Sequence, residues 1–176
     1  MNKTLLSAAL IAGFGIAAFA PLTARADGTI TFTGKVVAST CTFNVNGGGA
    51  SGTGAVALPV VFTSALTAAG NVAGNTPFNI VVSGCDSNLT SVQERFSGTN
   101  IAADGNLKNT GTATNVEVQL LSGTTTVINL NTNANSPVGT LASGGVTLNY
   151  SAQYFATGAA GSGLVNTAVA YTTNYL

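Results

Sequence analysis

The sequence of 176 residues contains no histidine and no tryptophan. A Ser-His-acid catalytic arrangement and any metal site that needs a histidine ligand are therefore excluded. The five carboxylates are scattered singly along the chain, so the sequence lacks the pattern of a glycosidase pair. Residues 86–88 and 131–135 carry oxygen atoms that could bind calcium, but Asp and Asn are also ordinary turn residues. We expect no catalytic residues, no cofactor and no metal ion.

Charge is scarce as well. Charged residues make up 6% of the chain, far below the usual quarter. Five basic residues in all cannot form a patch for nucleic acid or a polybasic segment for an anionic membrane. Such a composition suits a β-sandwich, or a protein whose surface is mostly covered by neighbouring molecules.

After residue 26 no segment of useful length has apolar residues at the spacing of a helix. The residues before this point form a targeting segment. Lys3 supplies a positive start, an apolar run follows from residue 5 to residue 20, and Ala24-Arg25-Ala26 is an A-x-A cleavage site. The apolar run is short for a membrane-spanning helix. We expect residues 1–26 to be a signal peptide that is cleaved between Ala26 and Asp27, so that the chain is exported.

The sequence has two cysteines, Cys41 and Cys85. In an exported protein they predict a disulfide bond, although two buried thiols remain the alternative. Closing a loop of this size would stabilise the fold by about 4 kcal/mol in the chain-entropy model.

The most informative stretch is Thr29–Val36, which alternates strictly. Ile30, Phe32, Gly34 and Val36 share one face, and threonines and a lysine share the other. After Val36 the apolar residues move to odd positions, which reverses the face that they occupy. We therefore predict two strands in different environments. The second begins the domain, and the first has no evident partner in its own chain.

Further short apolar runs follow, separated by clusters of Gly, Asn, Ser and Thr. We predict a flexible loop over 46–54, a single helical turn within 63–74, and a closing strand with Val169, Tyr171, Thr173 and Tyr175 on one face. The other predicted strands and edge pieces cover 56–62, 78–82, 93–97, 116–120, 127–130 and 146–154, and the closing strand covers 165–175. Many short strands without helices indicate an all-β sandwich or barrel.

Several of these segments, taken in order, resemble the pilin subunits of the chaperone–usher pathway, the type 1 fimbrial family. The segments are Thr29–Val37 before the first cysteine, Phe78-x-Ile80-x4-Cys85-Asp86, Leu107–Leu121, Leu148-x-Tyr150-x-Ala152-x-Tyr154, and the ending Tyr171-Thr-Thr-Asn-Tyr175-Leu176. The chain departs from the family in its longer glycine loop and its few charges, and neither departure touches these segments.

The resemblance implies an incomplete immunoglobulin-like β-sandwich, residues 37–176, that lacks its last strand. It also implies an N-terminal donor-strand extension, residues 27–36, in which Ile30, Phe32, Gly34 and Val36 enter a neighbour. The acceptor groove would be lined by Val169, Tyr171, Thr173 and Tyr175. The implied partners are a periplasmic pilus chaperone, an outer-membrane usher and neighbouring pilin subunits. Such a subunit passes through the periplasm to a cell-surface fimbria that supports adhesion.

An alternative is a soluble secreted carbohydrate-binding β-sandwich. In that case two tyrosine pairs, Tyr150 with Tyr154 and Tyr171 with Tyr175, would form the sugar platform. The extended strand ahead of Cys41 favours the fimbrial interpretation, because a lectin needs no such arm. An enzyme is the third and weakest interpretation, because histidine is missing.

Overall fold

The computed structural model describes residues 31, 33, 34, 36 and 41–176. The expected signal peptide and two donor-strand residues, Ile30 and Phe32, lie outside the described residues. Val36–Leu176 is one compact unit, and the residues before Val36 belong to another. Within the described chain no helix is long and apolar enough to cross a membrane.

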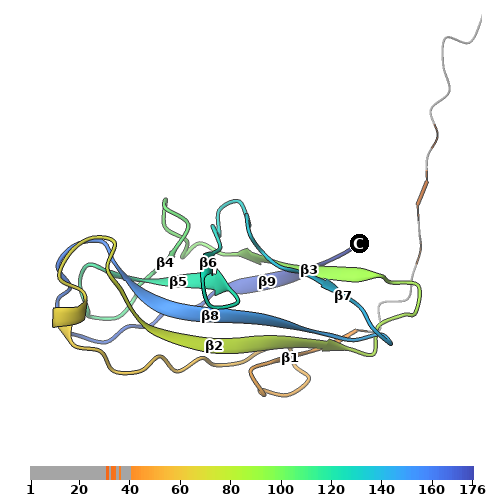
Figure 1. The fold of residues 1–176 in the computed structure, drawn as a ribbon, viewed down its shortest axis with the longest axis horizontal. Helices are drawn as coiled ribbons and strands as arrows, with labels where there is room; N and C mark the ends of the chain where they lie inside the picture. Colours follow the sequence, from red (N-terminus) through yellow and green to blue (C-terminus); the bar gives the residue numbers. More distant parts are fainter. Residues whose placement is uncertain (1–30, 32, 35, 37–40) are drawn as a thin grey trace, which may run out of the picture. The chain divides into compact units, whose positions relative to one another are not determined.

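The described part contains nine strands and one 3-10 turn, η1 (Figure 1). Six of the strands have four residues or more. The elements are β1 Thr42–Val45, η1 Thr63–Ala65, β2 Val72–Ser83, β3 Ser91–Ser97, β4 Leu107–Lys108, β5 Val116–Ser122, β6 Thr126–Val127, β7 Val138–Thr140, β8 Val146–Ala156 and β9 Ala170–Tyr175.

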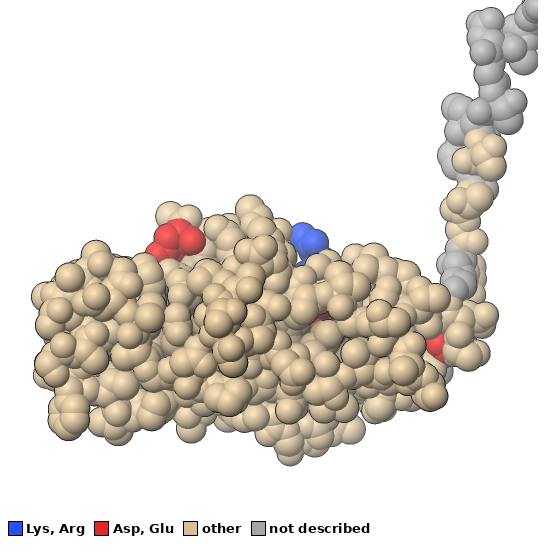
Figure 2. All heavy atoms as spheres, viewed as in Figure 1, with Lys and Arg blue, Asp and Glu red and all other residues tan. Residues whose placement is uncertain are grey.

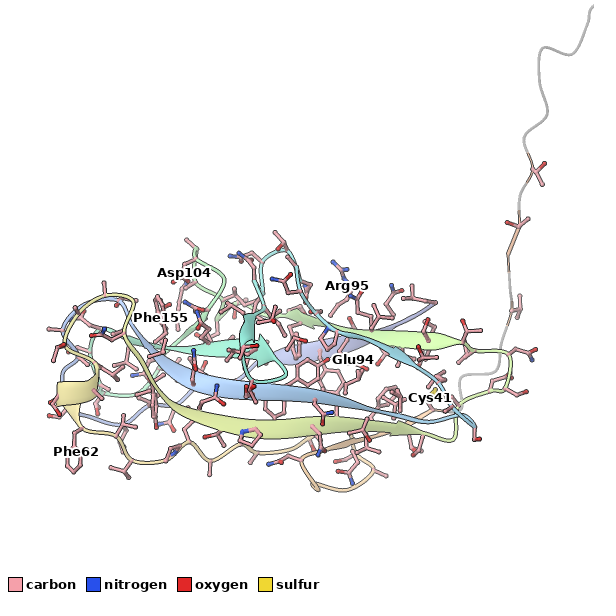
Figure 3. The ribbon with its side chains drawn as sticks, viewed as in Figure 1. Cys41, Phe62, Glu94, Arg95, Asp104 and Phe155 are labelled. Atoms are coloured by element: carbon pink, nitrogen blue, oxygen red, sulfur yellow. A yellow bond between two sulfur atoms is a disulfide. The ribbon has the colours of Figure 1, made fainter. Side chains whose placement is uncertain are left out.

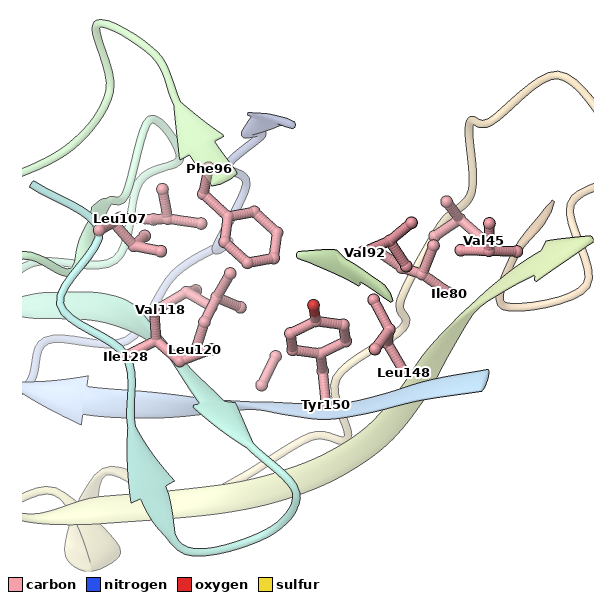
Figure 4. Packing of buried hydrophobic residues seen from close by; sticks show 13 residues of the cluster. Val45, Ile80, Val92, Phe96, Leu107, Val118, Leu120, Ile128, Leu148 and Tyr150 are labelled. Atoms are coloured by element: carbon pink, nitrogen blue, oxygen red, sulfur yellow. The ribbon is translucent and has the colours of Figure 1, made fainter. Parts of the chain in front are cut away.

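The strands form two sheets with antiparallel pairing. The larger sheet has the order β1-β2-β8-β5-β4, with β6 added to β5, and the smaller has the order β7-β3-β9. Alternating side chains from both sheets meet in one apolar core (Figure 4). The Phe96 ring of β3 meets the Tyr150 ring of β8 edge-on, with centroids 5.5 Å apart, so the two sheets pack face to face.

The predicted strands are found, with shifted boundaries. β2 begins at Val72, earlier than the alternation at Phe78 indicates, and a register shift between Ala73 and Thr76 accommodates Gly74. The predicted run at 56–62 is not a strand, since it enters no ladder. β9 begins at Ala170 and not at residue 165, because the preceding segment bonds instead to residues 109–113. The helical turn within 63–74 is present as η1.

The predicted disulfide is present between Cys41 and Cys85, 44 positions apart in the sequence. Cys41 lies directly before β1, and Cys85 lies two residues after β2. The bond therefore joins the start of the domain to the end of the central β2 strand, next to the Thr42–Ser83 pair that begins the ladder.

Candidate functional site

The edge of β9 that faces away from β3 carries free backbone groups. Ser91 and Leu176 exchange both of their backbone hydrogen bonds, and the register continues as Gln93–Asn174 and Arg95–Thr172. In an antiparallel ladder the intervening residues direct their N–H and C=O groups to the opposite edge. Tyr171, Thr173 and Tyr175 are these intervening residues, and no strand of the described chain pairs with that edge.

The same three residues place their side chains toward the core. Tyr171 and Thr173 are half-buried, and Tyr175 is 37% exposed although its partner on β3, Val92, is fully buried. Val169, just before the strand, is also half-buried against the core. The structure thus brings Tyr171, Thr173 and Tyr175 onto one face of β9, with Val169 just before it. That face is inward-pointing yet incompletely covered.

Tyr171 reaches from β9 toward the start of the domain. Its hydroxyl donates a hydrogen bond to the Gly52 carbonyl at 2.8 Å, and its ring meets the Phe43 ring edge-on at 6.4 Å. Burial and the nearby Glu94 carboxylate raise the pKa of the Tyr171 phenol. The glycine loop predicted at 46–54 therefore has a contact with β9. A β-carbon added at Gly52 would lie 3.1 Å from the Tyr171 oxygen.

Glu94 is the residue that the sequence prediction missed. It lies on the inward face of β3 between Val92 and Phe96, with 0% of its surface exposed (Figure 3). Its carboxylate oxygens accept the Thr173 hydroxyl at 2.8 and 3.0 Å across the ladder. Desolvation raises the pKa of the Glu94 carboxyl, and the bond from Thr173 partly opposes this. The sequence signal for its burial was that Val92 and Phe96, two residues to either side, are apolar and share its face.

The outer surface offers little charge for recognition. Figure 2 shows a face that is almost free of charged side chains. Burial and the neighbouring Asp104 raise the pKa of the Glu117 carboxyl. A surface of this kind fits the expectation that neighbouring molecules cover much of the protein.

Of the predicted donor-strand residues, the structure describes Gly34 and Val36. Val36 is 100% exposed, and neither Gly34 nor Val36 lies in a strand. A β-carbon added at Gly34 would meet no atom within 4 Å, and its φ lies outside the left-handed region. Nothing in the described part of the chain thus requires glycine at position 34.

Residues 30–175 match the model of the fimbrial protein family. This chain belongs to that family. It is 37% identical to the F17 fimbrial protein of Escherichia coli, covering 94% of this chain and 96% of that one. It is 40% identical to the major fimbrial subunit SMF-1 of Stenotrophomonas maltophilia, covering 90% of this chain and 98% of that one.

Solved pilus subunits share the fold of this fimbrial protein. A subunit of a chaperone–usher pilus, described in a study of rod uncoiling, superimposes with a TM-score of 0.61 at 20% identity. It covers 89% of this chain and 100% of its own. The P pilus rod subunit PapA gives a TM-score of 0.60 at 15% identity, over 78% and 100% of the two chains. The fold is therefore the incomplete immunoglobulin-like sandwich of pilins.

Proposed function

We propose that this structural subunit of a chaperone–usher fimbria polymerises through the free edge of β9. The edge would accept residues 27–36 of the next copy, which complete the smaller sheet. One observation carries the proposal: Tyr171, Thr173 and Tyr175 present both unpaired backbone groups and half-covered inward side chains. Strand addition supplies ladder hydrogen bonds to the first and apolar side chains to the second.

An antiparallel donor strand has a natural register. The four apolar-face residues of the extension are spaced by two, as are the four residues of the acceptor. Pairing Val36 with Val169 places Gly34 against Tyr171, Phe32 against Thr173 and Ile30 against Tyr175. In this register Gly34, which has no side chain, faces the half-buried Tyr171 ring. Phe32, the largest donor side chain, faces Thr173, the smallest acceptor residue. Size complementarity of this kind is what a packed core requires.

The isolated subunit would present this edge to any other chain, which is an aggregation hazard. We propose that a periplasmic pilus chaperone covers β9 until the outer-membrane usher presents the next subunit. Head-to-tail addition of one strand to one edge does not close on itself, so it builds a filament. The name of the SMF-1 relative agrees with a role in the shaft, and we propose that this filament supports adhesion at the cell surface.

The carbohydrate-binding alternative depends on tyrosines at the surface. Tyr150 is 1% exposed and stacks with Phe78 in the core, with ring centroids 5.4 Å apart. Tyr171 is tied to Gly52 by its hydroxyl. The pair of Tyr150 with Tyr154 therefore cannot form a sugar platform at the surface, and the proposal of a sugar site has no further support.

The test uses a synthetic peptide of residues 27–36 added to the full mature chain. Because the peptide would bind the folded form alone, a saturating excess should raise the melting temperature. The matched control is the same peptide carrying Phe32→Asp, which would bury an unpaired charge and should give no shift. If the unaltered peptide also gives no shift at saturation, β9 does not accept this strand.

A further inference from the structure

The further inference concerns Glu94, and it rests on the proposed use of the β9 edge. Glu94 is a fully buried carboxyl on the strand that holds β9, in direct contact with an acceptor residue, Thr173. Its neighbours in sequence, Gln93 and Arg95, occupy the opposite face of β3, and Figure 3 shows Arg95 pointing away from the core. The carboxyl therefore has no compensating cation from its own strand.

The groups that face Glu94 from the other elements are neutral. β9 contributes the Thr173 hydroxyl and the Tyr171 phenol, and β8 contributes the Tyr150 phenol, on which the carboxylate acts electrostatically. The core cluster to which the adjacent Val92 and Phe96 belong is otherwise apolar, with Ile80 and Leu148 among its members from the larger sheet. In the part of the chain that is described, a negative charge at Glu94 is stabilised by one hydrogen bond.

The donor strand in the register above adds nothing that could support this charge. Phe32 would lie beside Thr173, where its ring would offer no hydrogen-bond donor and would exclude water from the free edge. Removing that water makes the ionised carboxylate still less favourable than the neutral acid.

We propose that Glu94 couples insertion of the donor strand to the uptake of one proton. The incoming strand binds best to the subunit whose Glu94 carboxyl is neutral. The proton comes from the solvent and bonds to one carboxyl oxygen, and the other oxygen continues to accept the Thr173 hydroxyl. Burial already raises the pKa of this carboxyl with the edge open. The buried Tyr150 hydroxyl oxygen also lacks a hydrogen-bond partner among the described residues. The O–H group of a protonated Glu94 would therefore add a donor close to an oxygen that can still accept a hydrogen bond.

The experiment titrates the full mature chain with an excess of the 27–36 peptide by calorimetry between pH 5 and pH 8. Two buffers with different ionisation heats report the number of protons taken up. The wild-type chain should take up between zero and one proton per peptide. Its affinity should fall as the pH rises, by at most tenfold per pH unit. Glu94→Gln is the matched control, because it keeps the shape and a hydrogen-bond acceptor but cannot titrate. It should bind with an affinity that is nearly independent of pH.

Thr173→Val provides a second readout. Loss of the hydroxyl removes the bond that favours the ionised form, so the fall in affinity should begin at a higher pH than in the wild type. Titrating groups of the peptide, such as Asp27 and Lys35, contribute equally with every variant. Equal proton uptake by the wild type and Glu94→Gln would overturn the inference and leave strand binding standing. Absence of binding by both proteins at every pH would overturn the proposed function as well.

Discussion

Gly34→Leu is the substitution that tests the assembly register most directly. Among the residues that the structure describes, nothing constrains position 34, because a β-carbon there meets no atom within 4 Å and the backbone is not left-handed. The subunit itself should therefore keep its wild-type stability. In the proposed register the new side chain would meet the Tyr171 ring, which is held in place by Gly52 and Phe43.

The magnitude follows from the cost of overpacking. Forcing extra methylene groups into a packed site costs about 1–3 kcal/mol. Donor-strand affinity should thus fall by about 5- to 150-fold, since each 1.4 kcal/mol is a factor of ten. Gly34→Ala adds one methyl group and should lose much less. The assay is the yield of polymer on an unheated SDS gel, together with the melting temperature shift produced by a peptide that carries each change.

A compensating substitution makes the test specific for the register. Tyr171→Val removes the ring opposite position 34, so it should restore polymer formation to Gly34→Leu when both changes are present in one chain. A change at Thr173 should not restore it, because that residue pairs with Phe32 in this register. If Gly34→Leu polymerises as fast as the wild type, the register is wrong and the threonine face of the donor strand is the candidate that replaces it.

Four further outcomes are expected. Replacing Cys41 and Cys85 with alanine should lower the free energy of unfolding by about 4 kcal/mol, measured by denaturant titration, because the bond closes a loop over 44 positions; an unchanged midpoint would contradict this. Because the pKa of Glu94 is raised, the stability that its neutral form contributes is fully present below pH 4.5 and is lost as the pH rises through the folded-state pKa. Glu94→Gln should therefore unfold at higher denaturant than the wild type at pH 7, with a weaker but not absent pH dependence, because Glu117 also has a raised pKa. Tyr175→Ala should reduce chaperone co-purification and periplasmic level, and normal values for both would count against its place in the acceptor edge. Intact mass of exported protein should give an N-terminus at Asp27, and a start upstream of Ala24 would refute the cleavage site.

The sequence pattern predicted the fold where the alternation was long. β5, β8 and the core part of β2 have several apolar residues spaced by two, and they are the strands that bury the centre of the sandwich. The short strands β4 and β7 were not predicted, because two or three residues hold too little periodicity to be distinguished from a loop. β7 also contains Gly139, which the closely packed Leu148 and Val146 side chains require, and glycine usually argues against a strand.

The candidate site was predicted only in part, because periodicity reports which residues share a strand face and not how the strand pairs. Tyr171, Thr173 and Tyr175 follow a period of two, so the sequence places them on one face. Which edge of β9 remains free depends on the pairing with β3, and that pairing is set by tertiary structure. Glu94 was missed because a carboxylate within a short strand is normally assigned to the solvent face. Its burial became evident once Val92 and Phe96 were seen to share its face.

The topology also decides how a filament assembled in this way would carry tension. The proposed donor extension precedes Cys41 in the sequence, and the disulfide links Cys41 to Cys85. Six residues later β3 begins at Ser91, where backbone hydrogen bonds hold the end of the chain at Leu176. β3 pairs with β9 along its whole length, and β9 would hold the next donor strand. Force applied to the extension therefore reaches the acceptor edge through one covalent bridge, a short loop and one ladder. β1 and β2 flank the two cysteines, so part of the load would also enter the larger sheet at the Thr42–Ser83 pair.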